Sequence, residues 1–162
     1  MKDKDHATIS RTKKAADLRL CARFMAATEP WLTLGLDYEA CLSSATAPLR
    51  EVYAARARDG APLGFIILQM TGTFRGYIQT ICVAPEARGR GIGTRLIEFA
   101  ERRIFKVTQN VFICVSSFNK GARKLYRKLG YIKIGVLKDF IVKGRNELLL
   151  RKTRGPLRKE EK

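Results

Sequence analysis

Histidine and closely spaced cysteine, the usual protein ligands of zinc, are scarce in this sequence. The chain of 162 residues has one histidine, His6, and four cysteines, with no Cys-x-x-Cys pair among Cys21, Cys41, Cys82 and Cys114. A zinc site needs three or four such ligands at short spacings. We therefore expect no metal site, and we interpret the cysteines as reduced, mostly buried thiols.

Long apolar runs are also missing. No run approaches the roughly 20 residues that span a bilayer, and the first residues, MKDKDHATIS, lack the apolar core of a signal peptide. We expect a cytoplasmic protein without membrane contact, either a monomer or a homodimer. The length and the 46% hydrophobic content predict one globular domain, which we assign to residues 1–153, followed by a basic, flexible tail over 154–162.

Acidic residues are few relative to basic ones. The chain has 15 Asp and Glu against 32 Lys and Arg, a net charge of +17. Such a positive field attracts phosphates and anionic partners. The charge indicates a nucleic-acid, ribosomal or phosphorylated-cofactor partner, or else a basic surface that serves solubility alone.

The hydrophobic patterns that are present predict a mixed α/β domain. Strands are predicted over 7–13, 51–57, 63–71, 77–83, 111–115, 131–142 and 147–152. Helices are predicted over 15–28, from 37 to about 43, from 91 to about 107, and from a cap at Asn119 to Gly130; residues 31–36 read as an apolar loop. The order predicts a sheet of about seven strands, mostly antiparallel with one parallel pair, flanked by about four helices.

The most informative segment is VAPEARGRGIGTRL, which begins at Val83. It places three glycines and two interleaved arginines between a predicted strand and a predicted helix. The first N–H groups of a helix have no intrahelical partner and attract anions, and glycines let the backbone approach an anion closely. The segment therefore suits a pyrophosphate; the alternative is a tight turn without a ligand.

Two common nucleotide-binding motifs do not fit this segment. No Gly-Lys-Ser/Thr follows, so it is not a P-loop. Thr94 stands where the third glycine of a dinucleotide fingerprint would be, and the chain lacks the repeated β-α-β units of that fold.

The segment instead resembles the acetyl-CoA signature of the GCN5-related N-acetyltransferases (the GNAT superfamily). The matching residues are Arg88, Gly91 and Gly93, after a strand that ends Ile81-Cys82-Val83. The downstream stretch VSSFNKGARKLYRKLGYIKIG is similar to the family's strand-helix-strand pattern, with matches at Asn119, Ala122, Tyr126 and Gly130-Tyr131. The resemblance covers residues 7–153, and within the family it is nearest to enzymes that acetylate protein N-termini, including those of ribosomal proteins.

This resemblance implies the GNAT fold and direct acetyl transfer from acetyl-CoA to a primary amine in a ternary complex, with coenzyme A as product. The amine would be a protein N-terminus, a lysine or a small-molecule amine. The implied cofactor-binding residues are Ile81, Cys82, Val83, Arg88, Gly89, Arg90, Gly91, Ile92, Gly93, Thr94 and Asn119. A backbone N–H near Val83 would polarise the thioester carbonyl, and Tyr126 would protonate the departing thiolate. Without the resemblance, Tyr126 fits a core aromatic and Asn119 fits a plain helix cap.

One element of the family pattern is missing. Relatives of the ribosomal type carry a glutamate on the strand before the asparagine, where this chain has Cys114. A thiol near its ordinary pKa of about 8.5 is a poor base, so we interpret Cys114 as a core residue, with a covalent acetyl-cysteine as the alternative. The amine could lose its proton through water, to Glu29 or Glu39, or before binding.

The resemblance implies an acceptor site that the two N-terminal helices and the late strands border. The candidate substrate-binding residues there are Glu29, Trp31 and Glu39, although Trp31 also fits core packing and the two carboxylates also fit a solvated helix face. Long-range repulsion by the net charge disfavours a free polycation such as a polyamine as the acceptor. Two other functions remain as alternatives. One is a non-catalytic basic module that binds nucleic acid or the ribosome on this fold, and the other is an acyltransferase that prefers a longer acyl-CoA.

Overall fold

A computed structural model describes residues 7–158. The strands are β1 (Thr8–Arg11), β2 (Arg50–Arg56), β3 (Pro62–Gln69), β4 (Tyr77–Val83), β5 (Asn110–Ser116), β6 (Ile132–Leu137) and β7 (Glu147–Thr153). The helices are α1 (Ala15–Ala26), α2 (Trp31–Leu34), α3 (Tyr38–Thr46), the 3-10 turn η1 (Pro85–Ala87), α4 (Ile92–Ile104) and α5 (Lys120–Lys128). In the described range, no helix has the length and apolarity that crossing a membrane requires. His6 and the end of the predicted tail lie outside the described residues.

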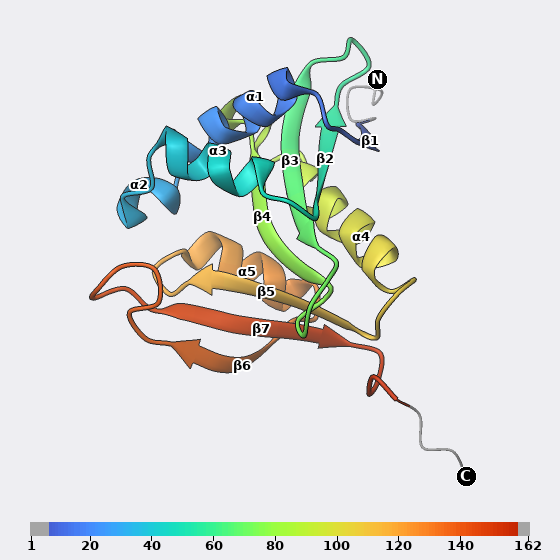
Figure 1. The fold of residues 1–162 in the computed structure, drawn as a ribbon, viewed down its shortest axis with the longest axis vertical. Helices are drawn as coiled ribbons and strands as arrows, with labels where there is room; N and C mark the ends of the chain where they lie inside the picture. The colour runs from blue at the N-terminus through green and yellow to red at the C-terminus, as the bar shows by residue number, and fades with distance from the viewer. Residues whose placement is uncertain (1–6, 159–162) are drawn as a thin grey trace.

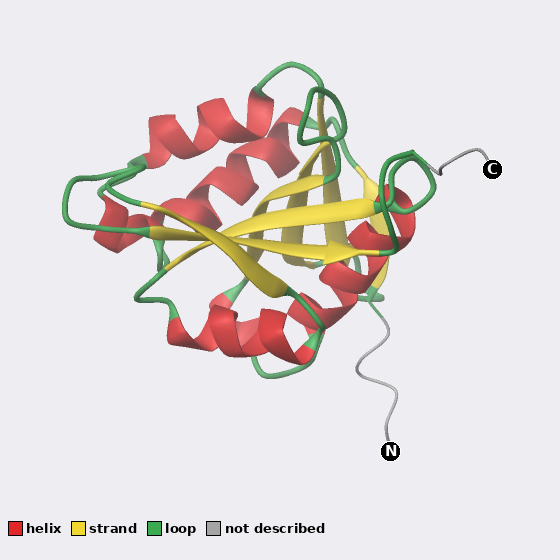
Figure 2. Cartoon of the chain, turned by 90° about the horizontal axis from the view of Figure 1, so that it is seen from below, coloured by secondary structure: helices red, strands yellow, loops and turns green. Residues whose placement is uncertain are grey.

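The strands form one sheet in the order β1-β2-β3-β4-β5-β7-β6. All neighbouring strands are antiparallel except β4 and β5, which are parallel and are connected through α4. Helices cover both sides of the sheet (Figure 2). The predicted fold class is therefore confirmed. The predicted apolar loop after Pro30 forms the single-turn helix α2, so five α-helices flank the sheet in the described range, one more than expected.

β3 shows why the sheet is covered on both sides. Its alternating side chains are buried on opposite faces: Ile66 and Leu68 pack in a core with α4 and α5, and Phe65 and Ile67 pack in a core with α1 and α3. All four are fully buried, and burial of each such side chain contributes roughly 1.5–3 kcal/mol. An apolar run without alternation is the pattern of a strand in the middle of a two-sided sheet.

A bulge in β4 opens the sheet at the site. The register with β3 shifts so that Gln79 has no residue opposite it, and its Nε2 donates to Ser44 Oγ of α3 at 2.5 Å. A bulge bends its strand and increases the local twist. Among the described residues, β4 pairs with β5 only at Tyr77 and Ile78. Beyond them the two strands diverge as a V (Figure 1).

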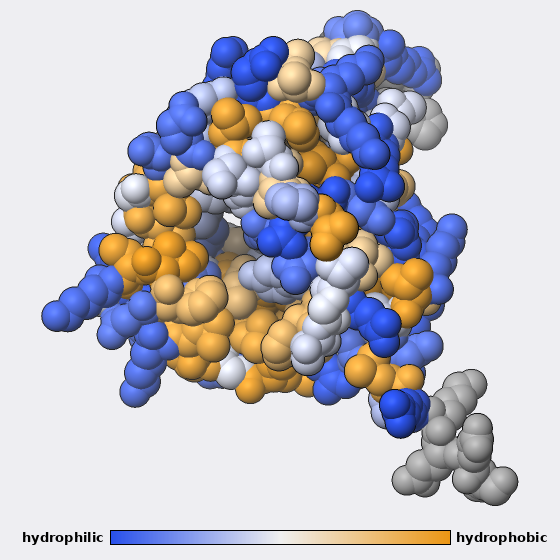
Figure 3. Space-filling view, viewed as in Figure 1, coloured by the Kyte–Doolittle hydropathy of each residue, from blue (hydrophilic) through white to orange (hydrophobic). Residues whose placement is uncertain are grey.

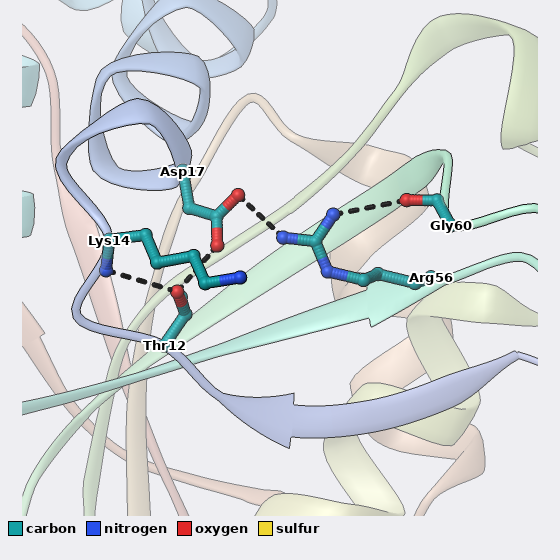
Figure 4. Close-up of polar contacts among 5 residues, drawn as sticks. All are labelled: Thr12, Lys14, Asp17, Arg56 and Gly60. Carbon is teal, nitrogen blue, oxygen red and sulfur yellow. Dashed lines mark hydrogen bonds and ion pairs between the residues drawn. The ribbon is translucent and has the colours of Figure 1, made fainter.

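A buried carboxylate fixes the start of α1 to the sheet. Asp17 accepts hydrogen bonds from Thr12 Oγ1 and from Arg56 Nη2, both at 2.5 Å, and Arg56 also donates to the Gly60 carbonyl at 3.1 Å (Figure 4). Burial alone would raise the pKa of Asp17. The hydrogen bonds from Arg56 and Thr12, with the charges of Arg56 and Lys14, outweigh burial and lower that pKa below its ordinary value.

The predicted strand over 131–142 is wrong in its second half, because β6 ends at Leu137. Asp139 adopts a left-handed conformation, with φ of 51°. Its Oδ1 accepts a hydrogen bond from the Gly144 N–H at 2.6 Å, and Asn146 Oδ1 accepts one from the Asp139 N–H at 3.3 Å. These short polar side chains close a loop. The sequence pattern predicted a strand there because the residues between them are mostly apolar.

Candidate active site

The divergence of β4 and β5 opens a cavity of about 250 Å³. Its walls come from β4, β5, α5 and the start of α4, together with the segment between α1 and α2 and the β6–β7 loop. In Figure 1, α2 and the β6–β7 loop border the open end of the V, and the space-filling view is hollowed there (Figure 3). The cavity therefore joins residues that are more than 100 positions apart in the chain.

This cavity is acidic although the chain is strongly basic. Two carboxylates line it, Glu29 and Glu147, and no lysine, arginine or histidine among the described residues does. Elsewhere the chain carries 32 Lys and Arg. Two carboxylates without a competing cation suit a bound ammonium group.

The glycine segment stands at one end of the cavity, where Gly93 forms part of the wall. Gly91 is the N-cap of α4 with φ of 75°, and the first intrahelical hydrogen bond runs from Arg95 N–H to its carbonyl. The N–H groups of residues 92–94 therefore have no acceptor within the helix. A Cβ on Gly89 or Gly91 would meet no atom within 4 Å, so backbone conformation and not crowding within the chain requires glycine at these two positions.

The side chains of the same segment have three different environments. Arg88 and Arg90 are exposed, and Arg88 Nε donates to the Val83 carbonyl at 3.3 Å, which holds the guanidinium beside the end of β4. Ile92 is 1% exposed and packs in the core under α4. Thr94 is half-buried. The predicted loop thus presents arginines and backbone N–H groups, while Ile92 can contribute only its backbone.

On β4, the predicted cofactor-binding residues alternate in direction. Ile81 and Val83 line the cavity. Cys82 faces away and packs in the α1–α3 core, where its Sγ is 4.0 Å from Cys21 Sγ. The Cys82 side chain therefore does not face the cavity, and its backbone lies opposite Phe65 of β3.

α5 brings the two downstream candidates to the cavity. Asn119 caps the helix through its Oδ1, which accepts a hydrogen bond from the Ala122 N–H at 3.1 Å, and it also lines the cavity. Tyr126 lines the cavity and is 4% exposed. Burial raises the pKa of its phenol, so the hydroxyl stays protonated near neutral pH and is available as a donor.

Cys114 was expected in the core, and the structure corrects this. It is half-buried on β5 and lines the cavity. Burial raises the pKa of its thiol, more than the neighbouring Tyr77 hydroxyl lowers it. Cys114 is therefore a neutral thiol near pH 7, which is a weak nucleophile.

Of the three residues predicted to bind the acceptor substrate, two line the cavity and one does not. Glu29 and Trp31 line the cavity, and Trp31 also packs against the α1–α3 core, so both interpretations of this tryptophan hold. Glu39 is exposed on α3 and does not belong to the cavity lining.

Glu147, at the start of β7, is a cavity carboxylate that the sequence pattern did not predict. It is 3% exposed and pairs across the ladder with Ser116 at the end of β5, whose Oγ donates to Glu147 Oε1 at 2.6 Å. Its signal was weak but present, because an acidic residue opens the otherwise apolar run Glu-Leu-Leu-Leu. Its position opposite Ser116 depends on strand order, which the sequence pattern does not give.

A second groove, of about 400 Å³, lies between α5 and the β6–β7 strands. Its basic lining residues are Lys120, Arg123, Lys124, Arg127 and Lys133. The chain between residues 102 and 138 contains no Asp or Glu. We refer to this surface as the basic groove.

The sequence matches a model of the Acetyltransferase (GNAT) family over residues 16–131. It is 34% identical over 105 residues to "N-alpha-acetyltransferase MAK3" of Arabidopsis thaliana, a match that covers 60% of this chain and 55% of that protein. The chain thus spans just over half the length of this relative.

Solved structures share the fold. An aminoglycoside 6'-N-acetyltransferase complexed with coenzyme A has a TM-score of 0.72 and 18% identity, covering 94% of this chain and 99% of the other. A GNAT superfamily phosphinothricin acetyltransferase from Sinorhizobium meliloti, in complex with acetyl-CoA, has a TM-score of 0.70 and 22% identity, covering 92% of this chain and 89% of the other.

Proposed function

The chain belongs to the acetyltransferase (GNAT) family, and on this premise we propose that it transfers an acetyl group from acetyl-CoA to a primary amine. The observation that carries the proposal is the cavity where β4 and β5 diverge, with a glycine-started helix at one end and a buried tyrosine in its wall. A thioester donor such as acetyl-CoA has an anionic pyrophosphate at one end and a reactive thioester at the other. The start of the helix suits the pyrophosphate, and the tyrosine suits the thioester.

The residues present fit acetyl-CoA. The free N–H groups at the start of α4, with Arg88 and Arg90, would hold the pyrophosphate. The unpaired edge of β4 from Ile81 to Val83 would hydrogen-bond the pantetheine amides, and Asn119 would contact the arm from α5. A Cβ added to Gly93 would lie 3.8 Å from both Val83 Cγ2 and Leu125 Cδ2. A side chain at this position would occupy the cavity between β4 and α5.

Acetyl-CoA supplies the acetyl group as a thioester, so that transfer forms a C–N bond and breaks a C–S bond. The Val83 backbone N–H would stabilise the negative charge that develops on the carbonyl oxygen. The protonated Tyr126 hydroxyl would donate to the departing sulfur. Direct transfer between the two bound substrates is favoured over a covalent enzyme because the Cys114 thiol stays protonated near neutral pH.

The acceptor would enter at the open end of the V, which faces α2 and the β6–β7 loop. Trp31, Phe140 and Ile141 line the cavity there, and Phe140 is 62% exposed. These apolar side chains, together with the cavity carboxylates, fit a primary amine carried on an apolar group. The net charge of +17 would repel a free polycation.

A panel of amine acceptors tests the proposal, with release of free thiol from acetyl-CoA as the readout. Peptides with free N-terminal amines and apolar first residues should be acetylated faster than polyamines, and N-terminally blocked copies of the same peptides serve as controls. No thiol release above the blocked controls, across peptides and small amines, would refute the activity. Substituting longer acyl-CoA donors tests the alternative chain-length preference.

The basic groove supports a second candidate function, the binding of nucleic-acid phosphates. Four of its five cations lie on successive turns of α5, and no Asp or Glu of the described chain lines it, which favours contact with a polyanion. Charge reversal at Lys124 and Arg127 should weaken the binding of a labelled RNA and reduce its salt dependence. The matched control is charge reversal at Arg19 and Arg23, exposed residues of α1. An equal loss of RNA affinity in both variants would mean that binding depends on the net charge of the protein and not on the basic groove.

A further inference from the structure

An acceptor amine enters as an ammonium ion, so a group must remove its proton. The structure places one candidate, a buried carboxylate, in the cavity wall at the first residue of β7. Glu147 Oε1 is held by Ser116 Oγ at 2.6 Å. Glu147 Oε2 has no hydrogen-bond donor among residues 7–158. The carboxylate is thus fixed through one oxygen and has the other available to a ligand in the cavity.

We infer that Glu147 is the general base for the acceptor amine and that Ser116 positions it; the inference rests on the proposed acetyl transfer. Glu147 Oε2 takes one proton from the ammonium, which frees the nitrogen lone pair for attack on the acetyl carbonyl. The nitrogen loses its second proton as the amide forms, and the departing sulfur gains one from Tyr126. The proton that leaves the nitrogen restores the Tyr126 hydroxyl, and Glu147 returns its proton to water.

The other acidic candidates are placed less well. Glu29 is exposed, and its two oxygens accept hydrogen bonds from the Thr33 N–H at 3.2 Å and from Thr33 Oγ1 at 2.9 Å. Both oxygens of that carboxylate are therefore occupied by Thr33 of the short helix α2. Glu39 does not line the cavity. Of the three acidic residues, only Glu147 is both buried in the cavity wall and held by a single partner.

The surroundings of Glu147 make it a better base than an ordinary glutamate. The titratable groups that face the cavity with it are Tyr77 on β4, Cys114 on β5, Tyr126 on α5 and Glu29 before α2, and none of them is a cation. Burial raises the pKa of Glu147, and the Ser116 hydrogen bond lowers it only in part. A carboxylate with a raised pKa holds a proton more readily than one at its ordinary value.

The test compares Glu147→Gln with the wild type over pH and over acceptors of different amine pKa. We expect kcat/KM near pH 7 to fall by roughly 10²–10⁴ and the acid limb of the pH profile, set by Glu147 in the wild type, to disappear. The loss should shrink at high pH and for weakly basic amines, because these acceptors are already deprotonated. Acetyl-CoA affinity should stay within about twofold.

Two further variants separate a base from a merely structural residue. Ser116→Ala removes the hydrogen bond that lowers the Glu147 pKa, so the acid limb should move to higher pH. A carboxyl-carbon NMR titration should show the same shift without any turnover. Glu98→Gln is the matched control, because Glu98 is an exposed carboxylate of α4 that does not line the cavity, and it should change kcat/KM less than threefold.

The outcomes distinguish the inference from the proposed function. If the wild-type protein transferred no acetyl group to any acceptor, the proposed acetyltransferase function would be refuted. Wild-type turnover with an unchanged pH profile in Glu147→Gln would refute the role of Glu147 alone. A loss in Glu147→Gln that is equal at all pH values and for all amines would also overturn the inference, because it would indicate a structural effect.

Discussion

The Tyr126→Phe variant should lose catalytic rate without losing stability. The Tyr126 hydroxyl has no hydrogen-bond partner among residues 7–158, while its ring contacts Tyr131 at a centroid distance of 6.0 Å. Phenylalanine keeps that ring and breaks no hydrogen bond of the described chain. Because a typical hydrogen bond contributes about 1 kcal/mol, the free energy of unfolding should change by less than about 0.5 kcal/mol.

The catalytic effect should be much larger. Loss of a positioned general acid lowers the rate by roughly 10²–10⁴, or about 2.7–5.5 kcal/mol of activation free energy. Since burial raises the pKa of Tyr126, the hydroxyl stays protonated, and the wild type should show no alkaline loss of rate from this group up to about pH 10.

Thiol release at saturating acetyl-CoA measures the rate, and urea denaturation measures the stability. Tyr131→Phe is the matched control, because Tyr131 is also buried but does not line the cavity; its rate should stay within about threefold of the wild type. A Tyr126→Phe rate within threefold of the wild type would refute the assignment of Tyr126 as the acid.

Three other substitutions test the fold and the site. Gly76→Ala should destabilise by roughly 3 kcal/mol or more in urea denaturation, because φ is 86° and a Cβ would lie 2.5 Å from the Asn110 carbonyl oxygen; an unchanged midpoint would contradict the close packing there. Asp17→Asn should cost roughly 1–3 kcal/mol at neutral pH. That difference should vanish as the pH falls through the lowered pKa of Asp17, below its ordinary 3.8, since only the charged form stabilises the fold. Cys114→Ala should keep turnover within about threefold, whereas abolished turnover would indicate a covalent acetyl-cysteine.

Much of the fold could be predicted from the sequence because its signals are local. The Asp37 and Asn119 caps form as expected, with side chains that accept hydrogen bonds from the Ala40 and Ala122 N–H groups. The strand over 77–83 has the predicted bounds. These features depend on residues within one turn or one strand, so a pattern reveals them.

The rest could not be predicted because it depends on contacts between distant segments. The bulge at Gln79 opens the site, yet no residue type marks it in the sequence. Glu147 reaches Ser116 only through the β5–β7 ladder, and Cys114 faces the cavity only because β4 diverges from β5. The roles carried over from the family resemblance for Tyr126 and the loop residues stay predictions.

Calorimetric titration with acetyl-CoA, on the wild type and on Gly93→Val, tests most directly whether the gap between β4 and β5 is the donor site. We predict one binding site per chain in the wild type. We also predict at least tenfold weaker binding in Gly93→Val, because the new side chain projects between Val83 and Leu125. At 100 times the dissociation constant, acetyl-CoA should stabilise the wild type by about 2.7 kcal/mol. No binding at millimolar acetyl-CoA, or equal binding by a stably folded Gly93→Val, would contradict a donor site in this gap.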